Sequence, residues 1–379
     1  MRVSGDWLTD PATQGVCAML TTAGHQALLV GGCVRNALLG VAVTDIDIAT
    51  DATPDRVVEL ARAAGLKPVP TGIDHGTITV VADGKPHEVT TFRRDVETDG
   101  RHATVAFSTD VAEDAARRDF TMNAIYARAD GTVVDPLGGL PDLRARHVRF
   151  VGDPDRRIRE DYLRILRFFR FTAWYGDPAL GMDADGLAAC AAGIDGLHAL
   201  SKERVGAEIR KLLSAPDPAP AVASMARAGI LNAILPGTDD RAFAPLVHLE
   251  GDEPPRWLRR LAVLGGDDPT DALRLSRHEQ RDLATLRDGI AGTRSPAALA
   301  ALHGATLAGD TVLLRAALLE TPPPPDWRAA VVRGAETPFP VTAADLPHLS
   351  GPALGAELKR LKTAWLSSDL RLTRSQLLG

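Results

Sequence analysis

Cysteine is scarce in this 379-residue chain, and positive charge is not in excess. The three cysteines, Cys17, Cys33 and Cys190, lie far apart and form no CxxC pair, so neither a disulfide framework nor a zinc site is expected. The chain has 43 Lys and Arg against 49 Asp and Glu, a formal net charge of −6. This balance excludes a uniformly basic nucleic-acid-binding protein but permits a local basic face.

Long hydrophobic runs are also missing. No apolar run reaches about 18 residues, the length that a membrane-spanning helix needs. The N-terminus carries Asp6 and Asp10 and lacks a basic-then-apolar signal pattern. With reduced cysteines and no membrane segment, the expected location is the cytoplasm.

Aromatic residues make up only 4% of the chain, whereas hydrophobic residues make up 45%, which favours a largely helical body with ample core material. Strand patterns occur only up to residue 151, so the sequence predicts an α+β protein with a small mixed sheet followed by helices. Pro- and Ala-rich breaks at 215–220 and 321–325 divide the helical part. The predicted units are a sheet-bearing head (1–150), a neck (151–214), a helical body (215–321) and a helical tail (322–379).

Local patterns predict the elements of the head. Apolar periodicity predicts one helix over residues 1–24, and the turn signal Asp83-Gly84 joins two predicted strands at 76–81 and 85–92. The other predicted elements are a polar, mobile loop at 92–110, a helix at 110–126 and a last strand at 147–151.

Two glycines separate a predicted strand from a predicted helix. Residues 27–30 are apolar, Gly31 and Gly32 follow, and residues 34–39 have a helical pattern. Backbone N–H groups at such a turn can approach an anion, and the helix N-terminus adds partial positive charge. Arg35 lies in the first turn of this helix, where its fork of donors can hold a phosphate. We therefore expect Gly32 and Arg35 to bind phosphate.

An acidic pair follows this turn. Asp45 and Asp47 alternate with Ile46 and Ile48, and residues two apart in a strand share a face. Both carboxylates are therefore expected together, with the isoleucines in the core. Adjacent carboxylates repel each other unless a cation lies between them, and Mg²⁺ with a substrate phosphate suits this arrangement. Glu88, on a neighbouring predicted strand, would be a third acid; solvated acidic side chains beside a glycine turn are the alternative.

A charged segment, RRDFTMNA, occupies residues 117–124 of the predicted helix. Arg117 and Arg118 would stabilise a triphosphate beside the glycine turn. Asp119 and Asn123 could bind ribose hydroxyls or hold the arginines in place. An ordinary amphipathic helix with ion pairs is the alternative.

The predicted neck begins with a strong helical pattern at residues 156–175. Asp161 and Arg164 are three apart, hence neighbours on one face, and a plain salt bridge between them would contribute only about 0.3–0.5 kcal/mol. Alternatively, the two side chains read the base of an incoming nucleotide: the Asp161 carboxylate accepts from an exocyclic amine, and the Arg164 guanidinium donates to acceptors on the ring. Such a pair would accept cytosine and adenine, which carry an exocyclic amine, and reject uracil. Arg167 and Arg170 are further candidates for nucleotide binding.

In this order, the motifs resemble those of a known family, the class II tRNA nucleotidyltransferases or CCA-adding enzymes of the polymerase-β-like superfamily. Their head motifs are similar to GGCVRNALLG with DIDIAT, to TGIDHGTITVV with EVTTFRRD, and to DGRHATVAFSTDVAEDAARRDFTMNAIY. Their neck resembles DPLGGLPDLRARHVRFVGDPDRRIREDYLRILRFFRF. The likeness is dense over residues 27–171 and looser beyond.

The resemblance implies a polymerase-β-like head and addition of CCA to the tRNA 3′ end from CTP and ATP. It implies that Asp45 and Asp47 are catalytic and bind Mg²⁺. Glu88 is expected to be the third catalytic carboxylate, because two-metal nucleotidyl transfer needs one site for the triphosphate and one to activate the attacking hydroxyl. Further implied roles are ribose and triphosphate binding by Arg118, Asp119 and Asn123, base templating by Glu160, Asp161 and Arg164, and a specificity-switch loop with Asp99 and Arg101. Many relatives have Arg-Asp where this chain has Arg35-Asn36, so Asn36 receives no metal role.

Related activities remain as alternatives. A bacterial poly(A) polymerase would share the head and neck, but such enzymes often carry a basic C-terminal extension that this tail lacks. The segment Asp161-Tyr162-Leu163-Arg164 also looks more like CCA-adding relatives. The sequence around Asp99 favours full CCA addition over a CC-only or A-only enzyme. A catalytically silent RNA-binding scaffold would have no use for three mutually repelling acids. No protein partner is expected.

Overall fold

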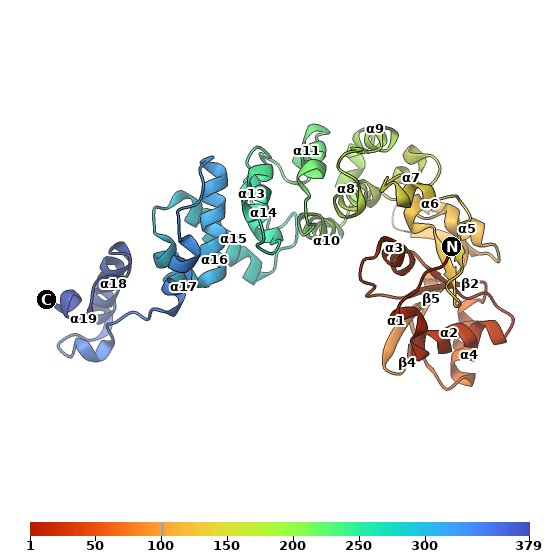
Figure 1. Cartoon of the computed structure of the whole chain (residues 1–379), viewed down its shortest axis with the longest axis horizontal. Helices are drawn as coiled ribbons and strands as arrows, with labels where there is room; N and C mark the ends of the chain where they lie inside the picture. The colour runs from red at the N-terminus through yellow and green to blue at the C-terminus, as the bar shows by residue number, and fades with distance from the viewer. Residues whose placement is uncertain (100–101) are drawn as a thin grey trace. The chain divides into compact units, whose positions relative to one another are not determined.

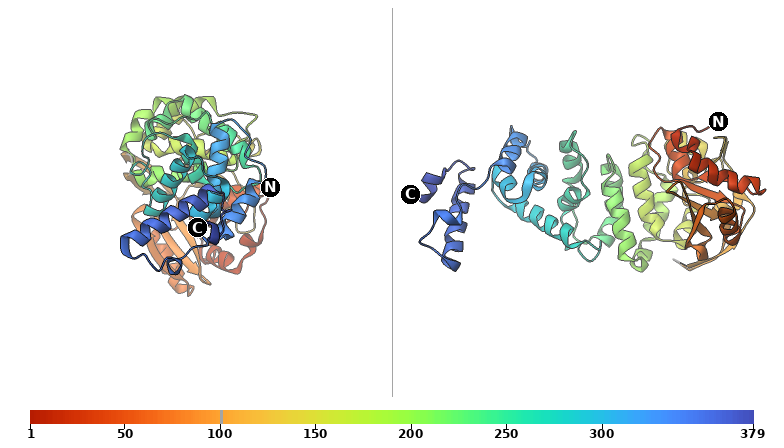
Figure 2. Two further views of the ribbon diagram at one scale, coloured as in Figure 1. Left: turned by 90° about the vertical axis from the view of Figure 1, so that its left-hand side faces the viewer. Right: turned by 90° about the horizontal axis from the view of Figure 1, so that it is seen from below.

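The computed structural model of the chain describes residues 1–99 and 102–379. They form two compact units, residues 1–200 and residues 201–379, which are described here one at a time. The first unit holds a sheet with helices (Figure 1, red to yellow-green), and the second holds helices (Figure 2, green to blue). The predicted α+β class is confirmed.

The first unit is built on a seven-stranded sheet with the order β3-β4-β5-β2-β1-β8-β9. The strands β2 and β5 are parallel, and the other neighbours are antiparallel, so the sheet is mixed as predicted. Its strands are β1 (Leu28–Val30), β2 (Asp47–Thr50), β3 (Lys67–Gly72), β4 (Thr77–Ala82), β5 (Lys85–Thr91), β8 (Tyr126–Arg128) and β9 (Val133–Val134). The predicted hairpin β4–β5 is confirmed, with Asp83 and Gly84 both at positive φ, as a two-residue hairpin turn requires.

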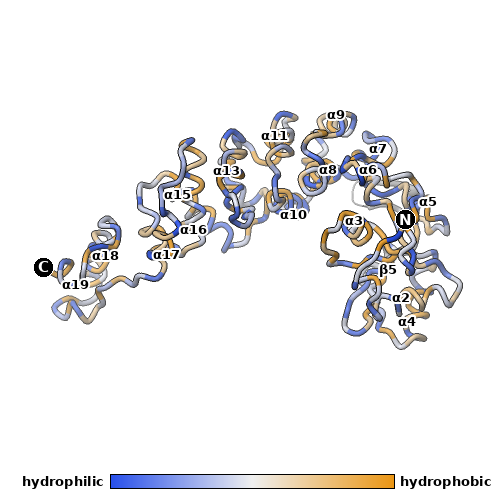
Figure 3. Tube along the Cα trace, viewed as in Figure 1, coloured by the Kyte–Doolittle hydropathy of each residue, from blue (hydrophilic) through white to orange (hydrophobic). Residues whose placement is uncertain are grey.

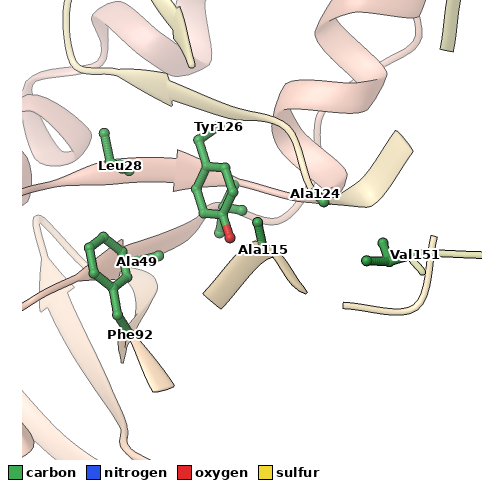
Figure 4. Close-up of a cluster of buried hydrophobic side chains, with 8 residues drawn as sticks. Leu28, Ala49, Phe92, Ala115, Ala124, Tyr126 and Val151 are labelled. Atoms are coloured by element: carbon green, nitrogen blue, oxygen red, sulfur yellow. The ribbon is translucent and has the colours of Figure 1, made fainter. Parts of the chain in front are cut away.

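Both faces of the sheet are covered. On one face, fully buried Leu29, Ile48 and Val89 pair across β1, β2 and β5. Helices α2 (Pro11–Thr22) and α4 (Pro54–Ala63) contact strands β4 and β5 of this sheet. The other face carries a second buried cluster, which includes Tyr126 from β8 and Ala115 from a helix above the sheet (Figure 4). Burial on both faces fixes the register of the central strands.

Nine helices are described in the first unit. Besides α2 and α4 they are α1 (Asp6–Thr9), α3 (Gly32–Leu39), α5 (Val111–Ala116), α6 (Leu140–Arg144), α7 (Pro154–Glu160), α8 (Leu163–Tyr175) and α9 (Ala184–Ala192). The single helix predicted over residues 1–24 is therefore wrong. Asp10 caps α2 by accepting from the Ala12 N–H, and Pro11 is its first residue. A proline there has no N–H to continue the preceding helix, so α1 ends before it.

The loop predicted at 92–110 is a hairpin in its described part. Strand β6 (Arg93–Asp99) pairs in antiparallel fashion with β7 (His102–Phe107). A two-stranded ribbon is held by its backbone hydrogen bonds and needs no regular apolar alternation in its sequence. The mostly charged sequence of β6 therefore concealed this strand and its pairing with β7.

The helix predicted at 110–126 ends at Ala116, and the strand predicted at 147–151 is absent from the described residues. Fully buried Phe120 instead forms an isolated bridge with Phe150, and a 3₁₀ turn follows at Thr121–Asn123. This tertiary pairing draws the chain out of the helix.

The helix predicted at 156–175 is two helices. The chain breaks at Asp161, whose φ of −156° and ψ of 106° are extended, so α7 ends at Glu160 and α8 begins at Leu163. Tyr162, inside the break, lies against Gly196 so closely that a Cβ on that glycine would be 2.0 Å from the ring. The break is therefore set by packing between distant segments.

The second unit is formed by helices, and no strand occurs in residues 201–379, all of which are described. Hydrophobic and hydrophilic stretches alternate along them (Figure 3). The helices are α10 (Lys202–Leu213), α11 (Ala219–Arg227), α12 (Ile230–Ile234), α13 (Phe243–Glu250), α14 (Trp257–Leu264), α15 (Arg277–Ala291), α16 (Pro296–Leu318), α17 (Trp327–Glu336), α18 (Gly351–Ser367) and α19 (Arg374–Leu378).

Among the described residues, α16 alone is long and apolar enough to cross a membrane by length and composition. It is interrupted at Gly304, which has non-helical φ and ψ, and it carries the buried carboxylate of Asp310. More than half of its apolar window is buried inside the protein. These features are those of a core helix.

Candidate active site

The glycine turn lies where β1 meets α3. Gly31 has φ 69° and ψ −120°, a backbone conformation that residues with a Cβ avoid. A Cβ on Gly31 would lie 3.5 Å from Nη1 of Arg118, and one on Gly32 would lie 3.8 Å from Nη2 of Arg35. Two guanidinium groups therefore flank the turn, as an anion-binding site requires.

Asp47 and Glu88 are direct neighbours in the sheet. Asp47 begins β2 and pairs with Val30 on one side and with Glu88 of the parallel strand β5 on the other. Paired residues of adjacent strands project from the same face, so the two carboxylates stand together one residue away from the glycine turn. The sequence prediction that Glu88 lies beside the aspartates is confirmed.

Asp45 reaches the same place from outside the sheet. It precedes β2 and is exposed, and Ile46 is only half-buried, so the prediction that Asp45 shares a strand face with Asp47 is wrong. The backbone carbonyl of Ile46 still accepts from the Glu88 N–H at 3.4 Å. Asp45, Asp47 and Glu88 line one cavity of about 680 Å³.

The crowding of these acids shifts the ionisation of Asp47. Burial, and next the Glu88 carboxylate, raise the pKa of Asp47 to about 6, with a smaller contribution from Asp45. Arg118 acts in the opposite direction. Burial and the neighbouring carboxylates both disfavour the ionised form of Asp47, and a bound cation would favour it.

The donor set of this cavity fits a divalent cation, since carboxylate oxygens are the ligands that Mg²⁺ prefers. Among the described residues, no three acidic, histidine or cysteine side chains gather closely enough to enclose a metal ion by themselves. Mg²⁺ is commonly held by one or two carboxylates together with substrate phosphates and water. Asp45 and Asp47 match that pattern.

Arg118 is fixed by two partners that the sequence did not reveal. Its Nη2 donates to Asp114 Oδ2 at 3.0 Å and its Nε donates to the Tyr126 hydroxyl at 3.0 Å. The same hydroxyl donates to Asp114 at 2.7 Å. Although burial opposes its charge, Tyr126 and Asp114 raise the pKa of Arg118, so the guanidinium stays charged beside the glycine turn.

Asp119 connects the segment that follows α5 to helix α8. Its Oδ1 accepts from the Phe120 N–H and from Asn123 Nδ2, both at 2.9 Å, and its Oδ2 accepts from Arg167 Nε at 2.8 Å. Burial alone would raise the pKa of Asp119, but Arg167 and these hydrogen bonds hold it below the usual range. Asp119 and Asn123 thus hold arginines in place, one of their two predicted uses.

Arg35 is buried behind the turn. Nη1 donates to Asn123 Oδ1, Nη2 donates to the Tyr175 hydroxyl at 2.8 Å, and the guanidinium lies 4.0 Å from the centre of the Tyr175 ring. Arg170 lies over the Phe171 ring at 4.5 Å. Tyr175 was missed from the sequence because it is 140 residues from Arg35.

The predicted base-reading pair does not share a helical face. The Asp161 carboxylate accepts from the Leu163 N–H at 3.1 Å, in the break between α7 and α8. Arg164 donates to Glu160 Oε2 at 2.7 Å and to the backbone carbonyl of Arg117 at 3.2 Å. The continuous helix expected through Asp161 and Arg164 is therefore wrong, and Arg164 contacts the backbone of the segment RRDFTMNA at Arg117. The side chain of Asp99 and the whole of Arg101 lie outside the described residues.

Comparison with known proteins agrees with this site. The family described as "Poly A polymerase head domain" matches residues 27–149, and "Probable RNA and SrmB- binding site of polymerase A" matches residues 181–241. The mouse protein named CCA tRNA nucleotidyltransferase 1, mitochondrial, is 34% identical over 373 residues, which cover 94% of this chain and 86% of the mouse protein.

Bacterial relatives are similar as well. The CCA-adding enzyme of Geobacillus thermodenitrificans is 39% identical over 66% of this chain and 57% of its own length. The crystal structure of the Bacillus stearothermophilus CCA-adding enzyme in complex with CTP has a TM-score of 0.75 and 29% identity, covering 95% of this chain and 94% of that one.

A mixed sheet with a glycine turn and neighbouring carboxylates, followed by helices, defines a nucleotidyltransferase with a polymerase-β-like head. Within that class, the likeness to the mouse protein over nearly the whole chain is decisive. The chain belongs to the CCA-adding tRNA nucleotidyltransferase family.

Proposed function

We propose that this chain adds or repairs the 3′-terminal CCA of tRNA from CTP and ATP. The observation that carries the proposal is the pairing of Asp47 with Glu88, one residue from the glycine turn. Both residues line a cavity with Asp45, and Arg118 acts electrostatically on Asp47. Phosphoryl transfer needs a positioned triphosphate and stabilisation of negative charge in the transition state. The carboxylates and guanidinium groups of this region supply both when a divalent cation is bound.

In the reaction, the 3′-hydroxyl of the RNA attacks the α-phosphorus of the nucleotide, a new P–O bond forms, and pyrophosphate leaves. Arg118 and Arg35 hold the phosphates at the glycine turn. Asp119 and Asn123 keep Arg167 and Arg35 in position through the hydrogen bonds described above. Glu88 keeps the carboxylate of Asp47 in a crowded, cation-attracting environment.

The cofactor would be Mg²⁺, and Asp45 and Asp47 would hold it. When bound it supplies charge neutralisation and activation of the attacking hydroxyl. Glu88 contributes to the same electrostatic field from the neighbouring strand. The proposal places Asp45, Asp47 and Glu88 in the catalytic role predicted from the sequence.

The base is selected by the neck helices. Asp161 and Arg164 offer an acceptor and a donor of the kind that cytosine and adenine can satisfy. Arg164 is oriented by Glu160, which is itself buried and contacts Arg157. Asp99 and Arg101 are proposed to belong to the loop that switches nucleotide specificity from CTP to ATP. The four-part division into head, neck, body and tail is part of the proposal. The tail is proposed to bind RNA, and the protein is proposed to act in the cytoplasm.

Primer extension with labelled CTP or ATP tests the proposal. The RNAs are tRNA lacking CCA, tRNA ending in CC, complete tRNA and an unstructured oligonucleotide. Addition of C, C and A to the first, of A to the second, and of nothing to the others is the expected result. Long A tails on the oligonucleotide would identify a poly(A) polymerase. Addition that stops after CC would identify a CC-only enzyme, and addition that occurs only on tRNA ending in CC would identify an A-only enzyme.

A further inference from the structure

The cavity that the three carboxylates line extends well beyond them. Its volume of about 680 Å³ falls in the range of pockets that hold a whole small molecule, about 300–1,000 Å³, so metal ions alone would leave most of it unfilled. Besides the acids, its lining includes Trp7 from α1, Thr13 from α2, and Lys85 and His87 from β5. The proposed function leaves this half of the cavity without a ligand.

The stereochemistry of the reaction decides what enters this half. In phosphoryl transfer the attacking and leaving oxygens lie roughly in line, on opposite sides of the phosphorus. Asp47 lies between Val30 of β1, which leads into the glycine turn, and Glu88 of β5. With the leaving pyrophosphate at the glycine turn, the attacking 3′-hydroxyl comes from the side of Glu88, where Lys85 and Trp7 line the same cavity. The ligand of this half is therefore the 3′-terminal nucleotide of the RNA.

The charge of the cavity does not favour an RNA phosphate there. Among the described residues that line it, four are acidic, Asp10, Asp45, Asp47 and Glu88, and Lys85 is the one Lys or Arg. The ammonium group of Lys85 is already engaged by the carboxylate of Asp10. Like charges repel, so contacts with phosphate contribute little, and the terminal nucleotide needs an uncharged partner.

His87 is occupied by the protein itself. It is 1% exposed, its Nδ1 lies 3.2 Å from the backbone carbonyl oxygen of Lys85, and its Nε2 lies 3.1 Å from the hydroxyl of Thr13. Because a carbonyl oxygen only accepts, Nδ1 donates and Nε2 accepts from Thr13. Burial lowers the pKa of His87, which favours this neutral form. The imidazole ring is thus a fixed wall of the cavity.

Trp7 supplies an uncharged aromatic surface. The buried residue of α1 is Leu8, whereas Trp7 is half-buried and lines the cavity. The indole packs against Gly5, where an added Cβ would lie 2.9 Å from both Cδ1 and Nε1 of Trp7. Gln14 Nε2 holds the segment by donating to the carbonyl of Leu8 at 2.7 Å and to that of Ala129 at 2.9 Å. The indole is therefore held in place before any ligand binds.

We infer that Trp7 stacks on the base of the 3′-terminal nucleotide of the RNA and so positions its 3′-hydroxyl beside Asp47 and Glu88. Aromatic side chains bind single-stranded bases by stacking whatever the base is, which suits an RNA end that changes with each added nucleotide. The inference rests on the proposed function, because it takes the second substrate to be RNA.

The test is a double-mutant cycle between Trp7 and the terminal base. It measures binding of an RNA hairpin to the full-length chain with Mg²⁺ and without nucleotide. One hairpin copies the acceptor end of tRNA and ends in CC, and a second differs only in lacking its last base.

The parent chain should bind the intact hairpin at least about fivefold more tightly than the abasic one, which is the lower end of the contribution of one stacked base. Trp7→Leu should bind the two hairpins equally, and Trp7→Phe should keep most of the preference. Trp257→Leu is the matched control, at a half-buried tryptophan of the second unit, and should behave as the parent does.

A parent chain without this preference, or a Trp7→Leu variant that keeps it, would overturn the inference. If Trp7→Leu does not fold, photocrosslinking of the parent decides. A 4-thiouracil base at the RNA 3′ end should then react with residues 5–13, and reaction only elsewhere would overturn the inference.

Incorporation of nucleotides into tRNA lacking CCA separates the two proposals. Normal addition of C, C and A by a chain without the terminal-base preference would refute this inference alone. A preference that depends on Trp7, in a chain that incorporates no nucleotide, would sustain the inference and refute the proposed function.

Discussion

Asp47 and Glu88 are register partners in the one parallel strand pair of the described sheet. Their carboxylates project from the same face, one residue from the glycine turn that Arg118 and Arg35 flank. Repulsion between them is part of the reason that the pKa of Asp47 is about 6. The relationship links the sheet topology directly to the chemistry of the site.

The raised pKa predicts how stability depends on pH when no metal is present. Folding raises the pKa of Asp47, so the folded state binds a proton more tightly than the unfolded state does. The contribution of Asp47 to the free energy of unfolding is therefore complete below its ordinary pKa and is lost as the pH rises through about 6. Asp47→Asn should therefore stabilise the metal-free protein at pH 8 and have little effect at pH 4. Thermal unfolding of parent and variant at several pH values, in the presence of a chelator, measures this difference; an equal effect at both ends of the range would contradict it.

Glu88→Gln tests the repulsion itself. Removal of the neighbouring negative charge should lower the pKa of Asp47 while burial continues to raise it. A titration of the metal-free protein followed by carboxyl-carbon NMR would show the Asp47 midpoint moving from about 6 toward lower pH. An unmoved midpoint would mean that burial accounts for the whole shift.

Arg164→Ala should loosen the choice of nucleotide. The guanidinium is oriented by Glu160 and by the carbonyls of Arg157 and Arg117, and its loss removes a directed donor from the proposed base site. Loss of a hydrogen bond that discriminates between bases is expected to reduce selectivity against UTP and GTP at least tenfold. Incorporation of each nucleotide into tRNA lacking CCA provides the measurement. Arg156→Ala is the control, because Arg156 contacts the same Glu160 from an exposed position. If Arg164→Ala selects nucleotides as the parent does, the base-reading role of Arg164 is refuted.

Gly196→Ala should disturb the break between α7 and α8. The added Cβ would lie 2.0–2.3 Å from atoms of the Tyr162 ring, so Tyr162 and its neighbour Asp161 must move. We expect a loss of about 1–3 kcal/mol in unfolding free energy together with increased incorporation of UTP. Gly15→Ala is the control, since no atom lies within 4 Å of its added Cβ. Destabilisation without any change in nucleotide choice would show that the break does not position Asp161.

Glu250→Gln should destabilise the second unit. Glu250 accepts from Arg259 at 2.8 Å and from Arg260 at 2.6 Å, and all three side chains are at most 3% exposed. Breaking a buried ion pair from one side typically costs about 3–5 kcal/mol. Asp239→Asn, which removes the exposed partner of Arg241, should cost less than about 1 kcal/mol. Urea unfolding of both variants tests the difference, and similar losses would contradict the assigned burial of the network.

The parts of the fold that local signals determine could be predicted from the sequence. The strand before the glycine turn and the hairpin at Asp83-Gly84 each depend on neighbouring residues. The breaks could not be predicted in the same way. Asp161 leaves the helix because Tyr162 packs against Gly196, and Phe120 leaves it to pair with Phe150. Both partners are at least 30 residues away in the sequence.

The candidate site shows the same division. Gly32, Asp47, Glu88 and Arg118 could be predicted because their residue types and spacing carry chemistry. Asp114, Tyr126 and Tyr175 hold the arginines, but nothing in their local sequence distinguishes them from ordinary core residues. Only the four-residue spacing of Asp114 and Arg118, which suits an ion pair on a helix, offered a signal.

The most direct test of the central claim is incorporation of labelled AMP into tRNA ending in CC by the parent and by Asp47→Asn, with tRNA binding measured on the same samples. If Asp47 holds the catalytic metal, the variant should bind tRNA as the parent does and lose incorporation by a factor of about 10³ or more. Incorporation within a few-fold of the parent, at equal tRNA binding, would contradict the account.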